Sequence, residues 1–199
     1  MADQTEVWLV RHGETEWSLS GQHTGRTEIE LTERGRAQAS ALRPVFASLR
    51  PAIVLCSPRL RAQQTAQLAG LVVDEIDPDL AEWDYGDYEG LTTAQIREQD
   101  PGWTIWTGIT PGGETEQQVT ERVDRVLTRV RSSLGAGPVV LVAHGHISRV
   151  IGARWTGLPA RQGGIFALDT AATCVLGSEH ALPVIAHWNV VYPIGQESA

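Results

Sequence analysis

Apolar residues in this chain gather in short continuous runs, and segments with a helical repeat of apolar positions separate the runs. Runs of this kind indicate buried β-strands. The predicted strands are Glu6–Val10, Ala52–Cys56, Leu71–Ile76, Pro138–Ala143, Thr173–Leu176 and Val184–Trp188. Because Pro138–Ala143 is apolar throughout, we expect it to be a central strand.

The helical segments lie between these runs. Thr32 is a candidate N-cap for a helix that reaches Leu49, and Pro44 is expected to kink or split it. The other predicted helices are Arg59–Ala69, Thr93–Gln99, Glu116–Leu134 and Ile147–Trp155. This alternation predicts an α/β fold, a three-layer sandwich with a mostly parallel sheet and helices on both faces.

The remaining segments are irregular. A loop is predicted after the first strand as far as Gly25, and the segment at about 77–115 is an insertion expected to form a wall or lid of a cleft. We expect residues 1–199 to form a single domain.

Composition supports a globular chain: 42% of the residues are hydrophobic and 20% are charged. No apolar stretch is long enough for a membrane span, and the polar N-terminus lacks the pattern of a signal peptide. The sequence therefore predicts a cytoplasmic protein. Cys56 and Cys174 lie in strand-like runs and are interpreted as reduced core thiols.

Charge excludes several functions. The net charge of −8 argues against binding to nucleic acids or anionic membranes. All 16 basic residues are arginines. Without a lysine, the chain has neither a Schiff-base nucleophile nor a P-loop.

Two predicted strands end in the same motif. One leads into Arg11, His12 and Gly13, the other into His144 and Gly145. Ligands of α/β sheets bind beyond the carboxyl ends of the strands, so both imidazoles are expected in one crevice. A neutral imidazole beside a guanidinium is suited to nucleophilic attack on phosphorus.

Two further segments carry candidate chemistry. Arg61 lies in the first turn of a helix after a strand, a position that favours anion binding. A proton donor is expected among the carboxylates of the next loop, where aromatic neighbours can raise a carboxyl pKa. The candidates there are Glu82, Asp84, Asp87 and Glu89, and spacing alone does not choose between them.

These motifs resemble the histidine phosphatase superfamily, the phosphoglycerate mutase-like proteins, over most of the chain. The matching segments are Arg11–Thr15, Thr24–Gly25, Leu31–Gly35, Ser57–Thr65, the Glu82 loop, Pro111–Thr115 and His144–Gly145. The resemblance implies that His12 is phosphorylated and that Glu82 is the acid/base. It also implies that the phosphoryl group is bound by Arg11, Arg61 and His144, with contacts from Ser18, Thr24 and the amides of Gly25 and Gly145.

The chemistry of the residues agrees with these roles. Two arginines and a protonated His144 would offset the phosphate charge, and no step requires a metal or another cofactor. His146 follows the motif glycine and is a candidate for substrate contact. The other histidines, His23, His180 and His187, are interpreted as structural or surface residues.

Hydrolysis is favoured over a cofactor-dependent phosphoglycerate mutase. The segment from Trp83 to Glu121 holds eight acidic residues and one basic residue, Arg97, which disfavours a second strong anion. Its aromatic residues favour an apolar or sugar-like leaving group. The run from Glu82 to Gly90 also resembles the acid and sugar-phosphate phosphatase branch of the family. The expected substrate is a small phosphorylated metabolite such as a sugar phosphate. Two rival hypotheses for the function are a non-catalytic phosphate-binding module and a metal hydrolase. The sequence does not determine the oligomeric state, and a homodimer is one possibility.

Overall fold

The computed structural model of the protein describes residues 6–195. They contain a six-stranded sheet in the order β3-β2-β4-β1-β5-β6. The strands are β1 (Val7–Arg11), β2 (Ile53–Cys56), β3 (Glu75–Ile76), β4 (Val139–Ala143), β5 (Thr173–Glu179) and β6 (Leu182–Val190).

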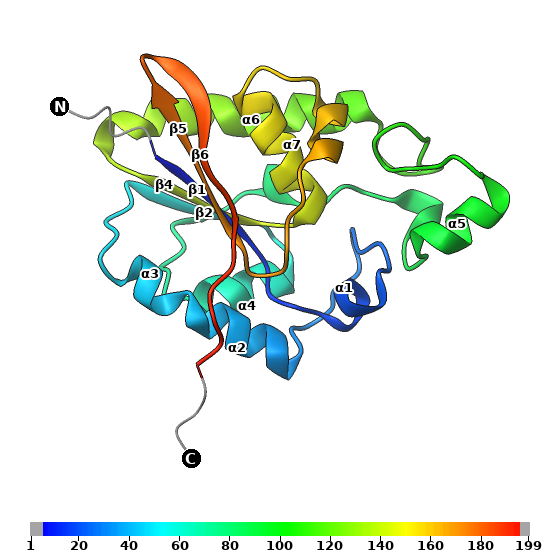
Figure 1. Cartoon of the computed structure of the whole chain (residues 1–199), viewed down its shortest axis with the longest axis horizontal. Helices are drawn as coiled ribbons and strands as arrows, with labels where there is room; N and C mark the ends of the chain where they lie inside the picture. The colour runs from blue at the N-terminus through cyan, green and yellow to red at the C-terminus, as the bar shows by residue number, and fades with distance from the viewer. Residues whose placement is uncertain (1–5, 196–199) are drawn as a thin grey trace.

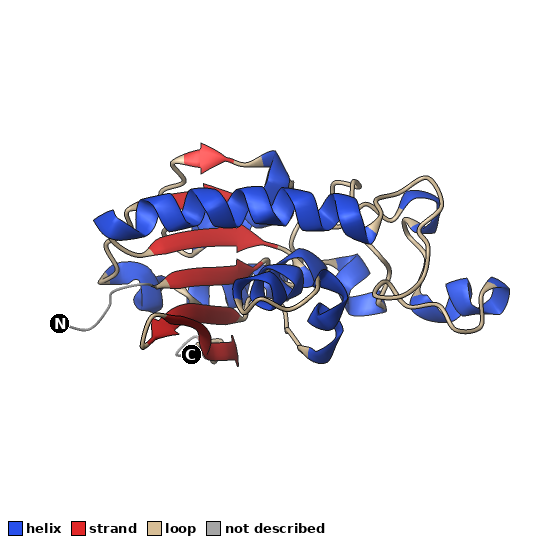
Figure 2. Cartoon of the chain, turned by 90° about the horizontal axis from the view of Figure 1, so that it is seen from above, coloured by secondary structure: helices blue, strands red, loops and turns tan. Residues whose placement is uncertain are grey.

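The sheet is mixed. Strands β1 to β4 pair in parallel, whereas β5 pairs antiparallel with β1 and with β6. Every residue of β4 is buried, so the prediction of a central strand is confirmed. The register places Arg11 opposite Ala143, and the residues after β1 and β4 therefore leave the sheet side by side. Figure 2 shows the parallel strands pointing toward one end of the molecule.

Helices cover both faces of the sheet, as predicted (Figure 1). They are α1 (Glu16–Ser20), α2 (Glu33–Ala41), α3 (Arg43–Ala47), α4 (Leu60–Leu68), α5 (Thr93–Gln99), α6 (Glu116–Ser133) and α7 (Gly145–Trp155). Alternate side chains of β4 divide between two cores. Leu141 packs with residues of α6 and α7, and Val142 packs with residues of α3 and α4.

One local prediction is confirmed, and two others differ from the structure. The predicted long helix is split at Leu42 into α2 and α3, as Pro44 requires near the start of α3. Helix α1 lies where a loop was predicted, and its capping box between Thr15 and Ser18 compensates for the lack of buried residues. β3 is two residues long, whereas a strand was predicted from Leu71, and Val72 lies outside the sheet and is 80% exposed.

The segment 77–115 leaves the sheet after β3 and returns to α6. It contains two 3-10 helices, Pro78–Leu80 and Gly86–Tyr88, and α5, which extends beyond the carboxyl ends of the strands (Figure 2). Trp83 and Trp103 are buried in the core. These two tryptophans therefore belong to packing and not to a leaving-group site.

Candidate active site

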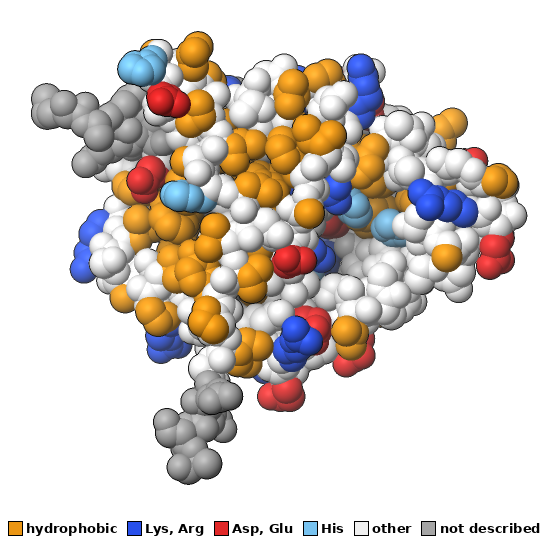
Figure 3. All heavy atoms as spheres, viewed as in Figure 1, with side chains coloured by type: hydrophobic (Ala, Val, Ile, Leu, Met, Phe, Trp, Pro, Cys, Tyr) orange, Lys and Arg blue, Asp and Glu red, His pale blue; other side chains and the backbone are white. Residues whose placement is uncertain are grey.

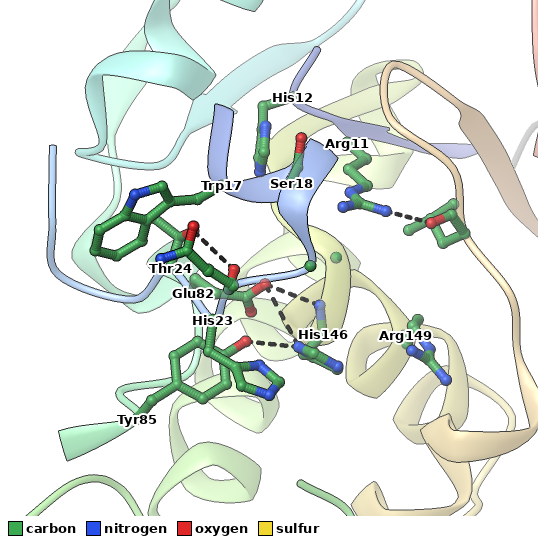
Figure 4. A pocket seen from close by; sticks show the side chains of 14 residues that line it. Arg11, His12, Trp17, Ser18, His23, Thr24, Glu82, Tyr85, His146 and Arg149 are labelled. Atoms are coloured by element: carbon green, nitrogen blue, oxygen red, sulfur yellow. Dashed lines mark hydrogen bonds and ion pairs between the residues drawn. The ribbon is translucent and has the colours of Figure 1, made fainter. Parts of the chain in front are cut away.

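A pocket of about 180 Å³ opens at the carboxyl ends of β1 and β4. Figure 3 shows the hollow, with histidine and basic side chains gathered in it. Figure 4 shows its wall from close by. The lining side chains include Arg11, His12, Trp17, Ser18, His23, Thr24, Glu82, Tyr85, His146 and Arg149.

His12 follows β1 directly, and its amide donates to the carbonyl of Ala143 at 3.0 Å. Its ring Nδ1 lies 2.7 Å from the carbonyl oxygen of Gly13. A carbonyl only accepts, so Nδ1 carries the proton and Nε2 of the neutral ring keeps its lone pair. Burial, with the charges of Arg61 and Arg11, lowers the pKa of His12 well below its usual value. His12 is therefore an unprotonated ring with a free nucleophilic nitrogen.

The loop that carries His12 is held by close backbone contacts. The Gly13 amide donates to Thr65 Oγ1 at 3.0 Å. A Cβ at Gly13 would lie 2.4 Å from the carbonyl oxygen of Gly35, and one at Gly35 would lie 2.1 Å from that of Glu14. Only glycine fits at both positions. The two glycines therefore fix the backbone on which the nucleophile stands.

His144 is fully buried behind His12, with ring centroids 5.1 Å apart. Arg61 Nε donates to His144 Nδ1 at 3.2 Å, and His144 Nε2 donates to Ser57 Oγ at 2.6 Å. Since Nδ1 accepts, the ring is neutral. Burial and the charge of Arg61 also lower the pKa of His144 well below its usual value. The expectation of a protonated His144 was therefore wrong for this structure.

The two predicted arginines have different surroundings. Arg11 lines the pocket, donates from Nη1 to the Leu168 carbonyl and lies beside Gly145. Its buried Nε has no partner among residues 6–195. Arg61 is fully buried and donates to the carbonyl oxygens of Thr24 at 2.9 Å and of the nearby Thr27 at 3.0 Å. The structure therefore places Arg11 at the pocket and Arg61 behind it. A direct contact between Arg61 and the phosphoryl group stays a prediction.

Glu82 is the carboxylate that lines the pocket. Its Oε1 accepts from the amides of Trp83 and Ile147, and its Oε2 accepts from the amide of His146, all at 2.9 Å. His146 and Ile147 are in the first turn of α7, where amides lack intrahelical partners. The helix therefore fixes Glu82 at the pocket wall.

The three remaining candidate carboxylates do not line the pocket. Asp84 forms an ion pair with Arg26. Glu89 accepts from the amides of Gly25 and Thr27. The eight acidic residues from Trp83 to Glu121 were expected to disfavour a second anion, but none of them lines the pocket, and Glu82 is the one carboxylate that does so among the described residues.

His146 lines the pocket, as proposed from its position after the motif glycine. Its Nδ1 lies 2.6 Å from the Tyr85 hydroxyl. Burial raises the pKa of Tyr85 well above its usual value, so the phenol keeps its proton. Among the described residues that hydroxyl bonds only to Nδ1, and we assign it as the donor. The neutral His146 ring then presents Nε2–H.

His23 was interpreted as a structural or surface residue. It is buried, with 9% of its surface exposed, and it also lines the pocket. Its ring centroid lies 4.6 Å from that of Tyr85 and 5.3 Å from that of Trp103. Burial lowers its pKa to about 4. His180 and His187 are exposed, as expected.

The smaller predicted contacts divide in the same way. Ser18, Thr24 and Gly145 line the pocket. The Gly25 amide does not, because it donates to both carboxylate oxygens of Glu89 at 3.0 and 2.9 Å. The Gly25 prediction is therefore corrected: this amide holds the loop and does not face the pocket.

Arg149 was missed by sequence reasoning. It lies on α7 one turn after Gly145, and residues four apart share a helix face. Its guanidinium stands 4.5 Å from the ring centre of Trp106. The spacing from Gly145 was the available signal for this second basic residue of the pocket.

A metal hydrolase would need several donors around one point. Between residues 6 and 195, no group of three or more histidine, cysteine, aspartate or glutamate side chains is placed to hold a metal ion. The same residues contain no helix long and apolar enough to cross a membrane.

Comparison with known proteins identifies the family. The chain is 47% identical over 180 residues to an acid phosphatase of Mycobacterium tuberculosis, covering 89% of each. It is 37% identical over 181 residues to sedoheptulose 1,7-bisphosphatase of Saccharomyces cerevisiae, covering 75% of this chain and 67% of the relative. A solved open reading frame product of M. tuberculosis aligns with a TM-score of 0.91 and 46% identity, over 94% of this chain and 97% of the other. The sequence model of histidine phosphatase superfamily branch 1 matches residues 7–191, and the chain belongs to that family.

Proposed function

We propose that the protein hydrolyses phosphomonoesters of small metabolites, without a metal or other cofactor, through a phosphohistidine at His12. The observation that carries the proposal is the state of the His12 ring. Its Nδ1–H donates to the Gly13 carbonyl, which leaves Nε2 unprotonated at the pocket. Neutral imidazole is the nucleophilic form of histidine.

In the first step, His12 Nε2 attacks phosphorus and the bond from phosphorus to the ester oxygen breaks. Glu82, in its acid form, gives its proton to the departing alkoxide. Arg11 and the Gly145 amide hold the equatorial oxygens, and His146 donates from Nε2–H. The products are phospho-His12, a free alcohol and the Glu82 carboxylate.

In the second step, the Glu82 carboxylate takes a proton from water as the water oxygen attacks phosphorus. The bond from phosphorus to Nε2 breaks, inorganic phosphate leaves, and neutral His12 and protonated Glu82 are restored. Arg61 and the neutral His144 support this cycle from behind the nucleophile. Arg61 supplies positive charge at short range, and His144 holds the guanidinium in place.

The relatives named as an acid phosphatase and a sedoheptulose bisphosphatase support a sugar phosphate or a compound of similar size as substrate. They also favour hydrolysis over the phosphoglycerate mutase reaction. The sequence supports a cytoplasmic enzyme that does not bind nucleic acids, and we carry forward a homodimer as a state to be measured.

The test is release of phosphate from p-nitrophenyl phosphate at about pH 5 to 7, in EDTA, by the native protein and by His12→Asn. We expect the native protein to turn over and His12→Asn to lose at least about a thousandfold in rate. His187→Gln, on exposed β6, is the control and should match the native protein.

The intermediate is tested separately. The protein is mixed with an ester whose phosphoryl group is labelled, the reaction is quenched with denaturant, and the label bound to the chain is measured. Acid-labile, base-stable label on the native chain and none on His12→Asn is the expected result. Phosphate binding without turnover would instead support a non-catalytic module. Loss of activity in EDTA would support a metal hydrolase.

A further inference from the structure

Arg149 is a second arginine of the pocket wall, and the proposed mechanism assigns it no role. We propose that Arg149 forms a second anion subsite, so that the preferred substrates carry a carboxylate or second phosphate on the alcohol part. This inference rests on the proposed function, because it takes the first phosphoryl group to lie at His12 and Arg11.

The position of Arg149 follows from α7. Gly145 begins the helix beside Arg11, and Arg149 lies four residues later. Four residues advance about 6 Å along an α-helix and return to the same face. Helical side chains lean toward the N-terminus of the helix, which is the pocket side. A small ester of a few carbon atoms can therefore span the two sites.

The Arg149 guanidinium is braced before any ligand arrives. Nε donates to the Gly163 carbonyl at 3.0 Å and Nη2 to the Gly164 carbonyl at 3.1 Å. The Trp106 ring packs against it with 4.5 Å between Cζ and the ring centre. Nη1 has no partner in the part of the chain that the structure describes. A planar group fixed on two sides, with one nitrogen free, is preorganised to donate to an anion.

Arg149 lacks a direct ion-pair partner, and the charge of Glu82 acts on it only at longer range. No carboxylate within residues 6–195 forms an ion pair with it, whereas Arg154 on the same helix pairs with Asp124 at 2.9 Å. Glu82, the one carboxylate in the pocket, is bound to backbone amides. Burial also lowers the pKa of Arg149, as expected for a cation short of hydration. A second anionic group of the substrate would supply the missing partner.

The experiment compares two esters with the same three-carbon skeleton. Glycerol 3-phosphate carries one phosphoryl group, and 3-phosphoglycerate carries a carboxylate in addition. We expect the native protein to have the higher kcat/KM for 3-phosphoglycerate hydrolysis. Arg149→Gln should reduce that preference by about ten- to a hundredfold, mostly through KM, as for loss of one charge-assisted hydrogen bond. Arg154→Gln is the matched control and should keep the native preference.

Binding gives a readout that does not depend on turnover. Calorimetric Kd values of both esters are measured on His12→Asn, with and without Arg149→Gln. The same loss of preference is expected there, so a protein without phosphatase activity would refute the proposed function and still test the subsite. Equal affinity of His12→Asn for the two esters would overturn the subsite. An equal loss of affinity for both esters in Arg149→Gln would also overturn it, because a residue that only supports the pocket wall would affect the binding of both esters alike.

Discussion

The buried His23 is expected to make the stability of the protein depend on pH. Burial lowers the pKa of this ring from 6.5 to about 4. The ring is therefore neutral in the folded protein at pH values where the unfolded chain is protonated. Because the unfolded state then binds more protons, folding stability is full above about pH 6.5 and is lost as pH falls toward 4.

The size of the loss follows from the two pKa values. A difference of about 2.5 units corresponds to about 3 kcal/mol below pH 4, at about 1.4 kcal/mol per unit. Near pH 5 the unfolded chain is almost fully protonated and the folded ring almost fully neutral, so about 2 kcal/mol is lost. In a chain of this size that loss lowers Tm by about 4–8 °C.

The assay is urea unfolding followed by tryptophan fluorescence at about pH 8 and about pH 5. His12, His144 and His146 also have lowered pKa values and contribute in the same direction, so the informative quantity is a difference between proteins. His23→Gln should lose about 2 kcal/mol less than the native protein between the two pH values. His187→Gln should follow the native protein. Equal losses in His23→Gln and the native protein would refute the reasoning.

Three further outcomes are expected. Gly13→Ala places a Cβ 2.4 Å from a backbone oxygen, so it should destabilise the fold and abolish turnover, whereas Gly102→Ala, with nothing within 4 Å, should change neither. Tyr85→Phe leaves a buried imidazole nitrogen without its donor and should cost about 1–3 kcal/mol in unfolding free energy, measured in urea. Burial raises the pKa of both Cys56 and Cys174 to about 12, so neither thiol should react with Ellman's reagent at about pH 8 until the protein is unfolded. Rapid labelling of the native protein would contradict the last prediction.

The order of strands and helices was predictable because burial acts on long stretches of the chain. The apolar run before His144 is buried over its whole length, and the periodic face of α6 packs on the sheet. Helix α1 has no buried residue, so only its capping box could have indicated it. Val72 is apolar and β-branched but lies outside the sheet, which pattern alone does not reveal.

The site was predictable where a residue follows a strand directly. His12 and Glu82 were identified in this way or by resemblance, and both line the pocket. The protonation of His144 depends on its contact with Arg61, 83 residues away in sequence, and no local pattern encodes it. His23 lies in an irregular loop, where the sequence carries no periodicity that points toward a ligand.

The attachment of Glu82 has an evolutionary consequence. The carboxylate belongs to the irregular segment 77–115, but its oxygens are tied near the start of that segment to amides of α7. Mutations farther along the loop can therefore reshape the entrance while the acid/base group keeps its place. Such an arrangement allows related enzymes to diversify in substrate range on an unchanged reaction centre.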